Sequence, residues 1–130
     1  MSTNPTDLPG PSVPILTLAE APLPSVYALE SDNRIAVESM LNYLPLPAPT
    51  IIARQDAVYV MVADLDDLGE WLRERGGRIH RSSAADGLEL WTLLTSTPER
   101  ADGSSVLVRV SVPVPMGEMV QDEIAAAVAA

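Results

Sequence analysis

Residues 58–79 have the sequence VYVMVADLDDLGEWLRERGGRI, in which an alternating apolar run leads directly into a helical pattern. Asp64 is placed to cap a helix, with two more aspartates in the first turn and two arginines in the last, as the helix dipole favours. Glu70 and Arg73 can pair across one turn, and the two glycines that follow can supply a left-handed C-cap. Every local signal therefore predicts a helix over Leu65–Arg75.

The run before this helix is apolar on both of its faces. Alternation places Val58, Val60 and Val62 on one side and Tyr59, Met61 and Ala63 on the other. A strand of this kind is expected in the middle of a sheet with cover on both faces. Because one helix covers only one face, we expect the terminal segments or a second copy of the chain to cover the other. This mismatch predicts a homodimer.

The flanking segments extend this unit to the order β-β-α-β-β-β. Strands are predicted at Thr50–Arg54 and Ala57–Ala63 before the helix, and at Arg78–Ser82, Leu88–Thr95 and Val106–Val112 after it. Ala85-Asp86-Gly87 marks a turn between two of them, and Pro113 and Pro115 are expected to end the last strand. We therefore expect an α+β fold with a small, mostly antiparallel sheet and one helix packed on a face.

Two further helices are predicted at the ends of this core. Ser31 or Asp32 can cap a helix whose apolar positions recur at helical spacing through Leu44, before two prolines end it. A short helix is expected within Gly117–Ala130. The chain thus divides into a Pro-rich extended or disordered arm over residues 1–30, a helix with a Pro-rich connector over 31–49, and a core domain over 50–130.

Most of the prolines lie near the start of the chain. Nine of the 12 fall in residues 1–49, and proline, which lacks a backbone donor, is excluded from helix interiors and central strands. The run Val13-Pro-Ile-Leu-Thr-Leu18 is nevertheless apolar enough to lie against the core or a partner. Tryptophan is enriched at binding hot spots. The candidate interface residues are therefore Val13, Ile15, Leu16 and Trp71.

The charge of the chain excludes several classes of protein. It has 18 acidic and 8 basic residues, a net charge of −10, and its acids are spread along its length, which indicates a solubilising surface. Nucleic acids and anionic membranes require clustered cations, so neither is an expected partner. The absence of cysteine excludes disulfides and thiolate metal sites. No apolar run approaches the roughly 20 residues of a membrane span, and no secretory signal is evident, so we expect a cytoplasmic protein.

Few residues suggest chemistry. His80 is the only histidine, and Glu89 on the next predicted strand could come close to it, as a catalytic base would require. Tyr59 and Trp91 could complete a small pocket around this polar pair. The aspartates at the start of the central helix lack the pattern of a calcium loop, and capping explains them. The sequence therefore predicts no catalytic, cofactor-binding or metal-ligating residue, and no cofactor.

The stretch over residues 58–79 resembles the opening strand and helix of the vicinal-oxygen-chelate, or glyoxalase-like, βαβββ module. The later strands fit the same order, so the resemblance covers residues 57–112. The family pairs two such modules around a metal held by His and Glu side chains. Here one module is present, and the strand positions where ligands are expected carry Val, Tyr, Met and Arg. The resemblance therefore implies an architecture and carries over no functional residue.

These observations predict that the chain is a non-catalytic protein-interaction or accessory protein, which acts as a homodimer or within an assembly. The missing catalytic set, the two-sided apolar strand and the Pro-rich arm support this interpretation. Two alternatives stay open. A small-molecule-binding protein with a glyoxalase-like module would use a pocket lined by Trp91, Tyr59 and His80. An acidic regulator of a basic partner would gather its carboxylates on one face.

Overall fold

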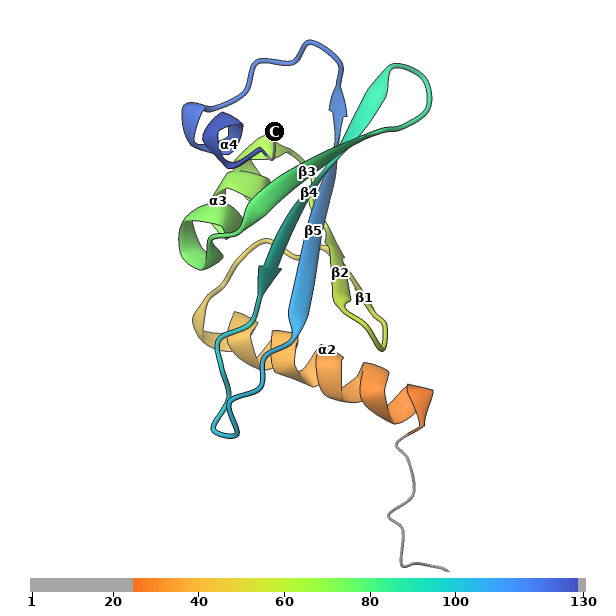
Figure 1. The fold of residues 1–130 in the computed structure, drawn as a ribbon, viewed down its shortest axis with the longest axis vertical. Helices are drawn as coiled ribbons and strands as arrows, with labels where there is room; N and C mark the ends of the chain where they lie inside the picture. Colours follow the sequence, from red (N-terminus) through yellow and green to blue (C-terminus); the bar gives the residue numbers. More distant parts are fainter. Residues whose placement is uncertain (1–24, 129–130) are drawn as a thin grey trace, which may run out of the picture.

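The structure, a computed structural model, describes residues 25–128, which form three helices and a five-stranded sheet (Figure 1). In chain order the elements are α2 (Val26–Tyr43), β1 (Thr50–Ala53), β2 (Val58–Met61), α3 (Leu65–Arg75), β3 (Arg78–Ser83), β4 (Leu88–Ser96), β5 (Leu107–Pro115) and α4 (Asp122–Ala127). The predicted α+β class is confirmed. Within this described part of the chain, no helix is both long enough and apolar enough to cross a membrane.

The sheet is mixed, and not mostly antiparallel as predicted. Its strand order is β1-β2-β5-β4-β3. The pairs β1–β2, β5–β4 and β4–β3 are antiparallel, whereas β2 and β5 run parallel with Val60 opposite Val110. The last strand in the sequence therefore lies in the middle of the sheet, between β2 and β4. From β2 onward the elements follow the βαβββ succession that the sequence resembles.

Helix α3 spans the predicted range, Leu65–Arg75. The Asp64 carboxylate accepts a hydrogen bond from a first-turn backbone N–H at 2.9 Å, which is the expected N-cap. The predicted pair between Glu70 and Arg73 is not formed, because Arg73 reaches across to Glu123 on α4 instead. This side chain therefore ties two helices together and does not stabilise α3 alone.

Trp71 lies in the core and not at an interface, which corrects its assignment as a candidate interface residue. Its side chain is fully buried, and its Nε1 donates to the carbonyl of Pro47 at 2.7 Å. This hydrogen bond joins α3 to the connector between α2 and β1. The other candidate interface residues, Val13, Ile15 and Leu16, lie outside the described residues.

Helix α2 begins at Val26, earlier than predicted. Ser25 is its N-cap, and the hydroxyl of Ser25 accepts from the backbone N–H of Ala28 at 3.0 Å. Residues 26–30, which the sequence assigned to the extended arm, are therefore helical. The end of the helix was predicted correctly, since it stops at Tyr43, ahead of the prolines that cannot continue it.

All three described helices build one core on one side of the sheet. In Figure 1, α3 and α4 lie on this side, and α2 crosses the lower end of the sheet. Helix α2 inserts Val37 and Met40 into the core, and α4 inserts Ile124. From the strands, the fully buried side chains include Val58, Val60, Ile79, Leu93, Val108, Val110 and Val112. The terminal helices thus pack on the same side as α3, and not on the second face that lacked a cover.

Strand β5 continues through the two prolines that were predicted to end it. The β2–β5 pairing stops at Ser111, whose carbonyl accepts from the backbone N–H of Val62 at 3.0 Å. Residues two apart in a strand direct their backbone groups to the same side. Pro113 and Pro115 therefore lack a donor only on the side where β5 has no neighbour, and proline is tolerated there.

Helix α4 is shorter than the segment predicted for it, Gly117–Ala130. The first residue of that segment adopts a φ of 86°, which belongs to a turn, and the helix starts only at Asp122. Beyond the helix, Val128 forms a bridge to Ile79 on β3. This contact closes the helical side of the core at the β3 edge of the sheet.

Candidate interaction surface

The second face of the sheet, called the open face from here on, carries no helix in residues 25–128 (Figure 1). It is formed by the even-numbered residues of β1, β3 and β4 and the odd-numbered residues of β2 and β5. Among them Ile52, Met61 and Leu107 are 41%, 38% and 52% exposed. Apolar side chains gathered on an uncovered face mark an interaction surface.

The open face differs in charge from the chain as a whole. The chain has 18 acidic residues against 8 basic ones, yet no strand residue of the open face is Asp or Glu. Arg109 lies near its centre on β5, and Arg78 and His80 lie at its edge on β3. The open face thus combines apolar side chains with positive charge, and such a surface favours an apolar partner that carries a carboxylate.

Arg109 is the residue that sequence reasoning missed. It is half-buried, with Tyr59 opposite on β2 and Leu94 opposite on β4. Its Nε is buried and has no hydrogen-bond partner within residues 25–128. A buried polar group that stays unpaired costs about 1–3 kcal/mol. An acceptor supplied from outside the described residues would remove that cost.

Tyr59 borders Arg109 on the open face. Its hydroxyl donates to the Oδ2 of Asp56, in the turn between β1 and β2, at 3.0 Å. This hydrogen bond raises the pKa of the Tyr59 hydroxyl, because loss of the proton would set a phenolate beside a carboxylate. Tyr59 therefore stays a neutral hydrogen-bond donor at neutral pH.

Replacement of Asp56 by Asn should lower the pKa of Tyr59 toward the ordinary value of 10.0. The amide can still accept the hydrogen bond but carries no charge that opposes the phenolate. Absorbance titration of the phenolate at alkaline pH measures this, with Tyr27→Phe and Tyr43→Phe in both proteins so that Tyr59 is the only tyrosine. Because the folded-state pKa is raised, the stabilising effect of the bond is present below the ordinary pKa and is lost as pH rises through the raised value. An unchanged titration curve would contradict the assigned bond.

The proposed polar pair of His80 and Glu89 is not brought together. His80 lies opposite Thr92, on the open face, whereas Glu89 lies on the core side of the sheet. The Glu89 carboxylate instead pairs with Arg81 at 3.3 Å and accepts from Trp91 Nε1 at 3.1 Å. The guanidinium of Arg81 also stacks over the Trp91 ring, 5.3 Å from its centroid. These contacts engage the carboxylate, so it does not orient the histidine.

The four residues of the predicted pocket are divided between two places. Tyr59 and His80 belong to the open face, whereas Trp91 and Glu89 line a cavity of about 480 Å³ beneath the loop between β5 and α4. Glu118 and the paired Arg81 are the other charged residues in its wall. The cavity falls in the size range of ligand sites, but it is not the predicted pocket.

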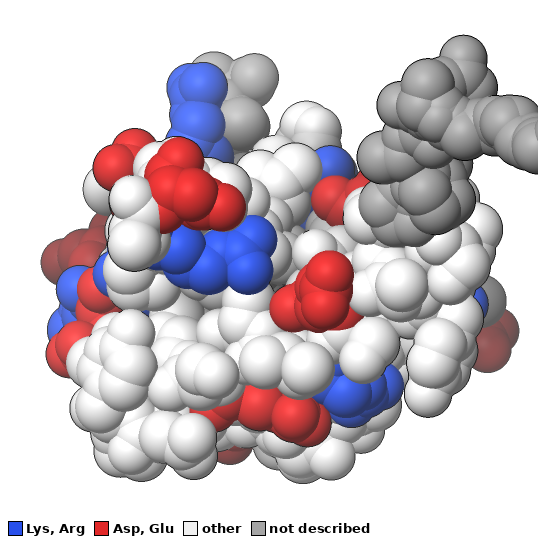
Figure 2. All heavy atoms as spheres, turned by 90° about the horizontal axis from the view of Figure 1, so that it is seen from below, with Lys and Arg blue, Asp and Glu red and all other residues white. Residues whose placement is uncertain are grey.

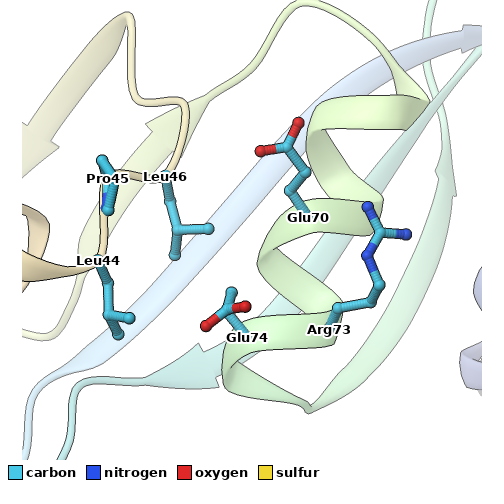
Figure 3. Close-up of a pocket in the computed structure, with 6 residues that line it drawn as sticks. All are labelled: Leu44, Pro45, Leu46, Glu70, Arg73 and Glu74. Carbon is cyan, nitrogen blue, oxygen red and sulfur yellow. The ribbon is translucent and has the colours of Figure 1, made fainter.

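A second groove lies between α3 and the connector that follows α2. In Figure 3, Glu70 and Glu74 extend from α3 toward Leu46 of the connector. The groove has a volume of about 320 Å³, and Arg73 on its rim pairs with Glu123 outside it. Two carboxylates beside an apolar floor can accept a basic side chain, but none of the catalytic groups considered above lies here.

The acidic side chains are dispersed on the face that Figure 2 shows. They stand there in separate groups, with arginines and uncharged residues between them. An acidic regulator that mimics a polyanion would need a continuous acidic surface, which the described residues do not form on this face. The lowered pKa of Asp102, caused by hydrogen bonds from the hydroxyl and backbone N–H of Ser104, is a local loop effect.

Neither a search for metal-ligand groups nor a comparison with known proteins indicates a further site. Within residues 25–128, no group of three or more His, Asp or Glu side chains is arranged to hold a metal ion. The chain matches no protein-family model, no curated protein and no solved structure. The similarity to a glyoxalase-like module therefore stays a resemblance of element order. The open face is the feature of the described residues that is best suited to binding.

Proposed function

We propose that the protein is a non-catalytic interaction protein that self-associates as a homodimer through the open face of its sheet. The observation that carries the proposal is the uncovered apolar face itself, with Arg109 at its centre. Helices α2, α3 and α4 all pack on the other side, so no helix of residues 25–128 covers Ile52, Met61 and Leu107, and burial of the open face in a complex would remove these side chains from water. Burial of apolar surface contributes about 25 cal/mol per Å² to association.

The charge of the chain is compatible with this role. The chain has a net charge of −10, and most of its acidic groups lie away from the open face. The acidic surfaces of two copies therefore repel one another. The strand residues of the open face include no acid, and Arg78 and Arg109 on it require an acidic or uncharged counterpart. The charge of the open face therefore restricts which surface of a second copy can cover it.

Substitution of Met61 by Asp tests the proposal in the full chain. Met61 is 38% exposed on the open face, and a carboxylate there would have to be buried in the dimer, which weakens association by roughly 100-fold or more. Light scattering coupled to gel filtration should give the mass of two chains for the natural sequence and of one chain for Met61→Asp.

Met119→Asp is the matched control. Met119 is 90% exposed in the loop between β5 and α4, so the same substitution should leave the dimer mass unchanged. Circular dichroism of both variants checks that the fold is retained. A natural chain that has the mass of one copy at all accessible concentrations would overturn the proposal, as would equal effects of the two substitutions.

A further inference from the structure

We infer that the open face of one copy is covered by residues Val13–Leu18 of a second copy, with Glu20 of that copy placed against Arg109. The inference rests on the proposed self-association and names what occupies the open face in the dimer. It is supported by the charge of the open face, by the length of chain ahead of Ser25, and by the position at which α2 begins.

Charge excludes a simple contact between two bare open faces. Such a contact would bring two copies of Arg109 together, and no strand residue of the open face is an acid that could neutralise them. Residues 13–24 supply the missing group, because their sequence VPILTLAEAPLP is apolar and has Glu20 as its single ionisable side chain. A carboxylate can accept from the Nε and Nη atoms of one guanidinium at once. It would therefore pair the buried Arg109 Nε that has no acceptor within residues 25–128.

The apolar segment is long enough to cross the sheet. Residues 19–24 connect it to Ser25 and span up to about 20 Å when fully extended. Five strands at the usual spacing make a sheet about 19 Å wide. The six residues Val13–Leu18 cover a similar distance. With Glu20 near Arg109 on the middle strand, only about 10 Å of sheet lies to either side, so the segment must run obliquely along β4 and β5, which at nine residues each are roughly 30 Å long.

The position of α2 favours the open face of a second copy over the chain's own. Asn33 donates to the carbonyl of Arg54, in the turn between β1 and β2, at 2.8 Å. The turns of α2 before Asn33 extend past this corner of the sheet in Figure 1. From Val26 to Asn33 the helix rises about 10 Å along its axis. A segment that enters α2 there would have to reverse direction at once to reach its own open face.

Two features at this corner favour a second copy over such a reversal. Pro22 and Pro24 fix φ and favour extended backbone between the apolar segment and the helix. Val26 and Tyr27, in the first turn of α2, are 52% and 80% exposed. A second copy docked beside this corner would cover both side chains and receive the segment without a reversal. Symmetric exchange then gives two equivalent contacts in each dimer.

Cysteine cross-linking tests the inference directly, because the full chain has no cysteine of its own. One preparation carries Ile15→Cys and a second carries Met61→Cys. The two are mixed, allowed to exchange subunits, and treated with a short bis-maleimide linker. We expect a product with the mass of two chains from the mixture. Met119→Cys replaces Met61→Cys in the matched control and should give little product, because residue 119 is outside the open face.

The charge contact has its own test. Glu20→Arg should weaken dimerisation roughly 30-fold or more, because it removes the partner of Arg109 and adds a like charge. Addition of Arg109→Glu should restore much of the lost affinity. Because Arg109→Glu alone could disturb the sheet, the deciding comparison is Glu20→Arg against the double variant, with circular dichroism spectra recorded for each.

The outcomes separate this inference from the proposed function. A dimer that Met61→Asp dissociates, but that gives no product between Ile15→Cys and Met61→Cys, overturns the inference and leaves the proposed function standing. A chain carrying both cysteines that cross-links only within itself, at the mass of one copy, overturns both. A two-chain product together with restored affinity in the charge-exchanged variant supports the inference.

Discussion

Replacement of Trp71 by Ala should lower the free energy of unfolding by about 3–5 kcal/mol. Trp71 is fully buried, and its Nε1 donates to the carbonyl of Pro47 at 2.7 Å. The substitution removes the largest fully buried side chain of the described core, opens a cavity, and leaves that carbonyl without its donor. Since domains of this size are stable by about 5–15 kcal/mol, the loss is a large part of the total.

Urea denaturation followed by far-ultraviolet circular dichroism measures this effect without relying on tryptophan fluorescence. Trp71→Phe is the matched comparison, because it keeps most of the ring volume and removes the indole donor. We expect it to cost about 1–3 kcal/mol. If Trp71→Ala changed the midpoint no more than Trp71→Phe does, the indole would not fill the core as described.

Helix α3 could be predicted to the residue because its signals are local. The Asp64 cap, the acidic first turn, the basic last turn and the glycine stop lie within one short stretch. The start of α2 was missed because Ser31 or Asp32 was predicted as its N-cap, which left residues 26–30 in the extended arm. Ser25, directly after Pro24, also has the side chain of an N-cap and is the residue that caps the helix.

The parallel pairing of β2 with β5 could not be predicted, because it joins residues about fifty positions apart in the sequence and rests on packing. Alternation in β5 did indicate that Arg109 faces away from the buried valines. Only the pairing shows that Arg109 sits near the middle of the sheet, between β2 and β4, and not at an edge. The positive charge near the centre of the open face could therefore not be predicted from the sequence.

The sequence itself argues against a pair between His80 and Glu89. The turn predicted at Ala85-Asp86-Gly87 sets Ser83 opposite Glu89 and His80 opposite Thr92, which is the observed register. Neighbouring residues in a strand alternate between faces, so this register puts His80 and Glu89 on opposite faces. The predicted turn therefore determines that the two side chains lie on opposite faces. The hypothesis of a polar pair rested on the fact that the two strands are adjacent in the sequence, and not on their register.

Gly77→Ala should be about as damaging as Trp71→Ala, at about 4 kcal/mol or more. Gly77 has a φ of 118°, and a Cβ placed on it would lie 2.3 Å from the backbone carbonyl oxygen of Leu94. Because that neighbour is backbone in β4, the clash can be relieved only if β3 and β4 separate where the pair between Arg78 and Leu94 begins.

Gly87→Ala provides the control at the other end of the same hairpin. Gly87 also has a positive φ, 74°, but a Cβ there has no neighbour within 4 Å, so only the conformational cost of about 1–2 kcal/mol applies. Urea denaturation of the two variants should separate their free energies of unfolding by about 2 kcal/mol or more. Equal effects would mean that the left-handed conformation, and not the close approach to Leu94, is what requires glycine at residue 77. If the larger effect is found, the start of the β3–β4 pairing at Arg78 and Leu94 requires a residue without a Cβ at position 77.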